Sequence, residues 1–157
     1  MSSIEVEIIS YTNQYNTDFA RLNFEWLEEH FYIEDYDKEV LTNPEKYILA
    51  PGGHIFFAIE NERAIGTVAL IKRGVGVFEL SKMGVTNTHQ GKGIGIALMN
   101  ACITYIKANN CKQLFLDSSR KLTPAITLYK KLGFKEIPVP KDTPYERCDI
   151  RMEIELD

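Results

Sequence analysis

Three glycines lie close together in residues 88–100, "THQGKGIGIALMN", between a hydrophobic strand pattern and a helical pattern. Glycine at a helix start costs roughly 0.5–1 kcal/mol relative to alanine, so Gly91, Gly93 and Gly95 need a physical reason. Unpaired N–H groups at a helix N-terminus bind anions, and residues without a side chain let a phosphate approach the backbone. The segment is therefore a candidate phosphate-binding loop; the alternative is a glycine-rich turn that packs tightly on a helix.

Two familiar phosphate-binding motifs do not fit this loop. A Walker loop ends in Gly-Lys-Ser/Thr, but here Lys92 is followed by Gly93. A dinucleotide fingerprint, GxGxxG, would need glycine where the chain has Ile96 or Leu98. The run from Gln90 to Gly95 instead has the form Q/R-x-x-G-x-G/A, directly after a strand and at the start of a helix.

The hydrophobic pattern around the loop predicts a single domain over residues 1–157, in the order β, α, α, β, β, β, α, β, α, β, β. The predicted strands are 4–9, 54–60, 63–73, 77–85, 112–118, 134–139 and one within 146–156, and the predicted helices are 16–27, 35–41, 94–107 and 123–133. Short turns join the second, third and fourth strands, which indicates an antiparallel meander. The strand at 112–118 is expected to lie parallel to the strand before the glycine loop.

Composition excludes several classes of protein. The formal net charge of −4 disfavours a nucleic-acid partner, since phosphate backbones are bound by clustered basic side chains. No window is apolar for long enough to cross a membrane, and the N-terminus lacks the basic flank of a signal peptide, so a cytoplasmic location is expected. Three cysteines without a CxxC pair argue against a disulfide framework and a zinc site, and no metal is expected.

Two stretches together resemble the GCN5-related N-acetyltransferase (GNAT) family: "ELSKMGVTNTHQGKGIGIALM" at 79–99 and "LFLDSSRKLTPAITLYKKLGF" at 114–134. The resemblance implies an α+β fold with a mixed, mostly antiparallel central sheet flanked by helices. It implies two parallel strands that splay where acetyl-CoA, the co-substrate, binds. A homodimer is the assembly that the resemblance suggests.

The resemblance also assigns residues to the donor. It implies that the pyrophosphate of acetyl-CoA binds the backbone of Gln90, Gly91, Lys92, Gly93, Ile94, Gly95 and Ile96, and that the pantetheine arm pairs like an extra strand with Met83, Gly84 and Val85. Members of the family commonly have a cofactor-holding asparagine where this chain has Leu122. We expect Ser118 or Ser119 to supply the missing polar contact.

Acetyl transfer to an amine requires two proton movements. An amine with a pKa near 10.4 is neutral in only about one molecule in 2,500 at pH 7, which corresponds to roughly 4.6 kcal/mol. Glu79 occupies the position where the family often has its general base; a water chain as base and a solvent-facing charge are the alternatives. Tyr129 occupies the family's tyrosine position and is the candidate donor of a proton to the leaving thiolate, against a packing role alone.

Residues 26–39, "WLEEHFYIEDYDKE", are rich in carboxylates and aromatic rings, which hints at an amine cation such as a polyamine or a lysine-like side chain, against a solvated helix pair. The candidate acceptor contacts are Trp26, Tyr32, Glu79 and Tyr145. The sequence thus predicts direct acetyl transfer from acetyl-CoA to a primary amine of a small molecule or peptide. An acyl-CoA sensor, or an acyltransferase with another acyl donor or a hydroxyl acceptor, is the alternative.

Overall fold

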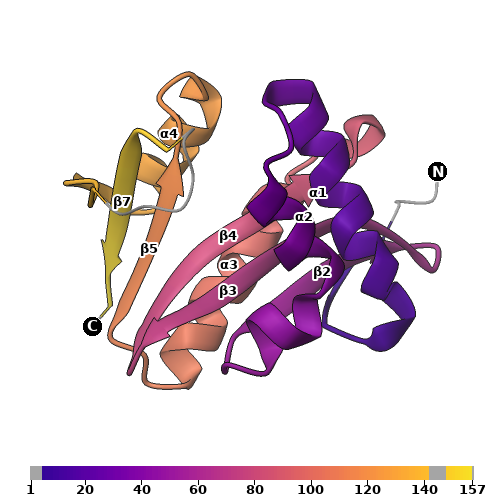
Figure 1. Cartoon of the computed structure of the whole chain (residues 1–157), viewed down its shortest axis with the longest axis horizontal. Coiled ribbons are helices and arrows are strands. Elements are labelled where there is room, and N and C mark those ends of the chain that lie inside the picture. Colours follow the sequence, from indigo (N-terminus) through magenta and orange to yellow (C-terminus); the bar gives the residue numbers. More distant parts are fainter. Residues whose placement is uncertain (1–4, 142–147, 157) are drawn as a thin grey trace.

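The computed structural model describes residues 5–141 and 148–156, and these residues form one mixed sheet with helices on both faces (Figure 1). The strands follow the spatial order β1-β2-β3-β4-β5-β7-β6. Their bounds are β1 Glu7–Ser10, β2 His54–Glu60, β3 Arg63–Gly74, β4 Val77–Val85, β5 Gln113–Ser118, β6 Lys135–Ile137 and β7 Ile150–Glu155. The helices are α1 Asn16–His30, α2 Asp35–Thr42, α3 Ile94–Ala108 and α4 Thr123–Lys131.

The predicted order of strands and helices is confirmed, as is the antiparallel meander of β2, β3 and β4. β5 pairs with β4 in parallel, and β7 pairs antiparallel with both β5 and β6. Several ends differ from the prediction. β1 begins at Glu7 rather than at residue 4, α1 continues to His30, and β7 begins at Ile150.

Two hydrophobic layers cover the two faces of the sheet. Side chains alternate along β2, so Phe56 and Ala58 belong to one layer while Ile55 and Phe57 belong to the other. α3 and α4 pack on the first layer, whereas α1 and α2 pack on the second. Figure 1 shows α1 and α2 in front of β3 and β4, with α3 behind. Among the described residues, no helix is long and apolar enough to span a bilayer.

β4 and β5 part soon after they begin. Their register comprises Val77↔Gln113, Phe78↔Leu114 and Glu79↔Phe115, and β4 then continues to Val85 without β5 beside it. In Figure 1 the two strands meet at their lower ends and diverge upward. This is the splay that the sequence predicted. Backbone groups of both strands face the gap.

The part of β4 that has no β5 beside it is shaped by a bulge and by a close contact. Thr67 and Ala69 of β3 pair with Gly84 and Ser81 of β4, so β4 has one extra residue here, and Lys82 has a left-handed φ of 56°. A Cβ at Gly84 would lie 2.8 Å from the backbone oxygen of Leu22. Glycine is therefore needed at position 84, because it lets α1 pack directly on the strand.

Candidate active site

A cavity of about 170 Å³ lies where β4 and β5 part. It brings together six of the side chains that the sequence predicted for the site, namely Trp26, Glu79, Met83, Ser118, Ser119 and Tyr129, together with Leu122 at the family's asparagine position. It also includes residues that the sequence reasoning did not assign to the site, among them Asn23, Phe31, Asp37, Lys82 and Asp117. The lining therefore combines groups from α1, α2, β4, β5 and α4.

Glu79 is a buried carboxylate on β4 with 3% of its surface exposed. Arg73 of β3 donates to it from Nε at 2.8 Å and from Nη2 at 2.7 Å. Both contacts fall on Oε1. A buried carboxylate is tolerated when a cation compensates it, so Arg73 explains how β4 keeps a charge in this position while Oε2 stays available to the cavity.

Tyr129 lies on α4 with 9% of its surface exposed, and its ring packs edge-on against Phe134. Burial raises the pKa of the Tyr129 phenol above its ordinary value of 10.0, and a hydrogen bond with the Ser118 side chain opposes part of that rise. The phenol is therefore protonated at neutral pH. A protonated hydroxyl at a cavity can act as a proton donor.

The glycine-rich loop is open on the side where a ligand could approach. Gly91 and Gly93 have φ of 79° and 81°, and a Cβ added at Gly91, Gly93 or Gly95 would meet nothing within 4 Å. The first intrahelical bond of α3 at this end runs from the N–H of Ala97 to the oxygen of Gly93. The preceding N–H groups at the helix start have no intrahelical acceptor, which is the arrangement that binds an anion.

Side chains hold the start of this loop in place. The Gln90 amide donates to the Val85 oxygen at 3.1 Å and to Asn87 Oδ1 at 3.2 Å. From α1, Glu25 Oε1 accepts from the backbone N–H of Asn87 at 2.8 Å. Gln90 thus has a role in shaping the loop, in addition to the donor contact that the resemblance implies. Lys92 and Ile96 are both exposed beside the glycines.

The acceptor contacts predicted from sequence are only partly brought together. Trp26 lines the cavity, next to Phe31 at a ring distance of 5.6 Å. Tyr32 does not line it and is 59% exposed. Tyr145 lies outside the described residues. Phe31 was within reach of the sequence reasoning, because it belongs to the aromatic segment 26–39.

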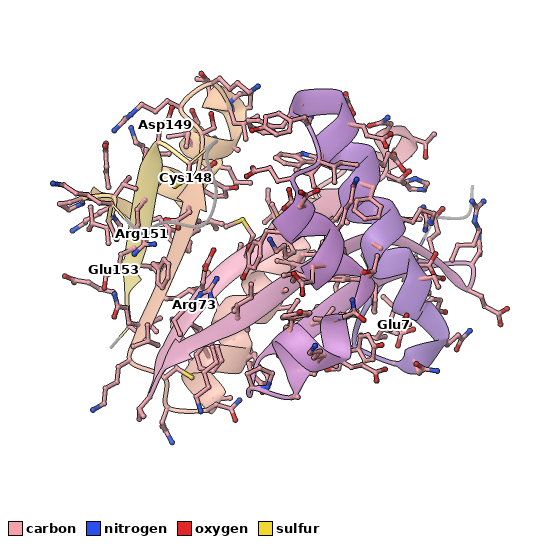
Figure 2. The ribbon with its side chains drawn as sticks, in the orientation of Figure 1. Glu7, Arg73, Cys148, Asp149, Arg151 and Glu153 are labelled. Atoms are coloured by element: carbon pink, nitrogen blue, oxygen red, sulfur yellow. The ribbon has the colours of Figure 1, made fainter. Side chains whose placement is uncertain are left out.

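Two further ion pairs border the cavity. Arg151 of β7 donates to Asp117 of β5 from Nε at 2.6 Å and from Nη2 at 2.9 Å. Lys82 Nζ lies 3.8 Å from Oδ1 of Asp37, and both side chains are at most 5% exposed. In Figure 2, Arg73 and Arg151 lie on opposite sides of the gap between β4 and β5. No local sequence signal pairs these residues, because each partner comes from a different element.

Cys148 also lines the cavity, near the start of β7 (Figure 2). Its thiol donates to the Ile150 oxygen at 3.6 Å. This contact is one that a neutral thiol makes.

A mixed sheet that parts between parallel strands, with a glycine-rich loop opening a helix beside the gap, defines an acyltransferase of the N-acetyltransferase class. The chain belongs to the acetyltransferase (GNAT) family, whose family model matches residues 7–134. This family uses acetyl-CoA as the acyl donor.

Relatives and solved structures agree with this assignment. The chain is 29% identical over 149 residues to the N-acetyltransferase YobR of Bacillus subtilis, covering 87% of this chain and 58% of YobR. It is 28% identical to an N-alpha-acetyltransferase of Sulfurisphaera tokodaii, covering 87% of this chain and 74% of that protein. A GNAT acetyltransferase structure from Staphylococcus aureus has a TM-score of 0.87 at 25% identity, covering 98% of this chain and 100% of the other.

A crystal structure of PaiA N-acetyltransferase from Thermoplasma acidophilum, determined with coenzyme A, has a TM-score of 0.75 at 17% identity. The match covers 98% of this chain and 100% of that one. At this identity the likeness concerns the fold.

Proposed function

We propose that this chain transfers an acetyl group from acetyl-CoA directly to the primary amine of a small molecule or peptide. The observation that carries the proposal is that one cavity at the parting of β4 and β5 is lined by both Glu79 and Tyr129. These are a carboxylate that can accept a proton and a phenol that can donate one. Acetyl-CoA supplies the thioester carbon that the amine attacks.

The donor is held by backbone groups in this proposal. The N–H groups at the start of α3, within Gln90–Ile96, bind the pyrophosphate, and exposed Lys92 adds a positive charge. Gly84 and Val85 pair with β3 on one side, but Met83, Gly84 and Val85 have no β5 strand beside them on the other, and the pantetheine arm binds along that side. Ser118, which lines the cavity, is the polar contact on the β5 side, where Leu122 replaces the family's asparagine.

Glu79 acts as the general base. Arg73 occupies its Oε1, so Oε2 receives the proton of the attacking ammonium, directly or through a water. This proton must leave because the neutral amine is the nucleophile, at roughly 4.6 kcal/mol for a pKa of 10.4 at pH 7. Backbone N–H near Val85 donates to the oxyanion that develops on the carbonyl.

Tyr129 acts as the general acid. As the C–S bond breaks, its hydroxyl gives a proton to the departing sulfur. The nitrogen, which becomes positively charged on attack, loses its second proton to solvent, and Tyr129 regains one from solvent. Burial raises the pKa of the Tyr129 phenol, so the hydroxyl is protonated before the C–S bond breaks. The same rise makes the phenol a weaker acid, so the role rests on its position in the cavity and not on its pKa. Cys148 forms no acetyl intermediate in this scheme.

Release of free thiol from acetyl-CoA in the presence of a panel of amines tests the proposal. Tyr129→Phe and Glu79→Gln should each lower turnover, while the matched variants Tyr105→Phe on α3 and Glu155→Gln at the end of β7 should not. Wild-type turnover in both Tyr129→Phe and Glu79→Gln would contradict the roles assigned to these two residues. Acetyl-CoA binding without transfer to any amine would indicate a sensor, and faster reaction with longer acyl chains or hydroxyl acceptors would indicate another acyltransferase.

Location and assembly are part of the same proposal. We propose a cytoplasmic protein, in keeping with three free cysteines. A homodimer, suggested by the family resemblance, is tested by the molar mass in solution.

A further inference from the structure

Every carboxylate in the described lining of the cavity is already paired with a cation of the chain itself. The pairs are Glu79 with Arg73, Asp117 with Arg151, and Asp37 with Lys82. Each pair joins two different elements of the fold. The cavity therefore presents negative groups whose charge is already compensated.

One aromatic ring of the cavity lining, that of Phe31, is also in contact with a cation of the chain. Lys121, from the segment between β5 and α4, places Nζ 3.9 Å from the centroid of the Phe31 ring. The same ammonium donates to the backbone oxygen of His30 at 2.6 Å. A ring face that could hold an ammonium ligand thus already holds one.

The acidic segment 26–39 contributes little negative charge to the cavity. Of its carboxylates, only Asp37 lies in the described lining. Asp37 also accepts from the backbone N–H of Glu34 at 3.0 Å, as part of the capping box that starts α2. The Asp37 carboxylate is therefore already bound to the start of α2 and to Lys82 in the absence of a ligand.

We propose that the acceptor is a monoamine with an apolar remainder, and that this cavity disfavours an acceptor with a second ammonium. An ammonium taken out of water needs a carboxylate or a ring face of its own. Here the three carboxylates and the ring of Phe31 are engaged by Arg73, Arg151, Lys82 and Lys121, which would also repel it. An apolar remainder instead meets Trp26, Leu27, Leu122 and Ala125. The inference rests on the proposed function in taking this cavity as the acceptor site, and it opposes the polyamine hint of segment 26–39.

Hexylamine and 1,5-diaminopentane test this inference as a matched pair. They have the same number of heavy atoms and the same reacting amine, and differ in a terminal methyl against a terminal ammonium. Binding to the protein in the presence of coenzyme A is measured by calorimetry, and kcat/KM by thiol release. Hexylamine should bind at least about tenfold more tightly, since the diamine must desolvate a charge without a partner.

Lys121→Met identifies the cause of the preference. This variant removes the ammonium from the ring of Phe31, so the ratio of the hexylamine affinity to the diaminopentane affinity should decrease about two- to fivefold. Lys131→Met, the same change at an exposed position of α4, is the control and should leave the ratio unchanged.

Three outcomes would overturn the inference: equal or tighter binding of the diamine, failure of both amines to bind, or equal effects of Lys121→Met and Lys131→Met. These results differ from failure of the proposed function. That failure would appear as absent thiol release with every amine in the panel, even where hexylamine binds.

Discussion

Replacing Gly95 by alanine should strengthen the fold and leave donor binding nearly unchanged, whereas leucine at the same position should weaken donor binding. Gly95 lies in the first turn of α3, and an added Cβ would meet nothing within 4 Å. Its φ is not in the left-handed region, unlike those of Gly91 and Gly93. Alanine therefore fits the unliganded protein without strain, and the form Q/R-x-x-G-x-G/A also accepts it, so only a larger side chain at this position would conflict with a ligand at the loop.

The expected magnitudes follow from this geometry. Gly→Ala at a compatible backbone position stabilises a protein by about 0.4–1 kcal/mol, because the unfolded chain loses conformational freedom. For a domain of this size, that raises Tm by about 1–4 °C. The side chain of Gly95→Leu would extend to where the pyrophosphate approaches the backbone, so the affinity of this variant for acetyl-CoA should fall at least about tenfold, or about 1.4 kcal/mol.

Calorimetry provides both quantities, by thermal scanning without ligand and by titration with acetyl-CoA. Gly74→Ala is the matched control, because a Cβ there also has room, with its nearest atoms 3.8 Å away on Val77. This control should leave the affinity for acetyl-CoA unchanged. Unchanged affinity in Gly95→Leu would refute the assignment of the loop, and a lower Tm in Gly95→Ala would refute the claim that the fold has room for the methyl.

Three further variants test other parts of the structure. Tyr129→Phe keeps the packing on Phe134 but should lower kcat about 10²-fold, and a wild-type kcat in this variant would contradict the acid role. Because burial raises the pKa of the Tyr129 phenol, ionisation of this group should cause no loss of the wild-type rate below pH 10. Gly84→Ala places a Cβ 2.8 Å from a backbone oxygen of α1, so overpacking should reduce stability by about 1–3 kcal/mol, and an unchanged Tm would show that α1 moves freely. His54→Phe keeps a ring against Tyr105. Because burial lowers the pKa of His54, the wild type should lose stability as the pH falls below about 6.5. Tm measured against pH should fall less in the variant than in the wild type.

Much of the fold could be predicted because each element is bounded by turn residues and carries a clear period. The bounds of β2 and β4 agree with the pattern, since glycine or asparagine turns flank both strands. The π-helical turn Glu45–Leu49 was missed, because five residues are too few to display a helical period. The extra turn at the end of α1 was missed for a related reason: polar residues 28–30 continue the helix without continuing its apolar stripe.

The candidate site could be predicted only where a local motif carries it. The glycine loop, Glu79 and Tyr129 are recognisable in single stretches of sequence, whereas the partners Arg73 and Lys121 are not. Lys82 is the sharpest case, because a left-handed φ at lysine has no sequence signature and depends on the bulge in β4. The acidic character of segment 26–39 is a related case, because composition counts charges while tertiary structure decides which of them are compensated.

The early end of the pairing between β4 and β5 gives this sheet an edge in its interior. Exposed strand edges usually invite other chains to add a strand, which proteins prevent at their outer edges. Here residues of α1 and α4 line the opening, and in the proposed function it receives the pantetheine arm, a chain with amide groups of its own. Recognition of the donor at this opening would then depend on the pantetheine arm and very little on the acyl group attached to it. Discrimination between acyl groups would depend on the cavity where the arm ends.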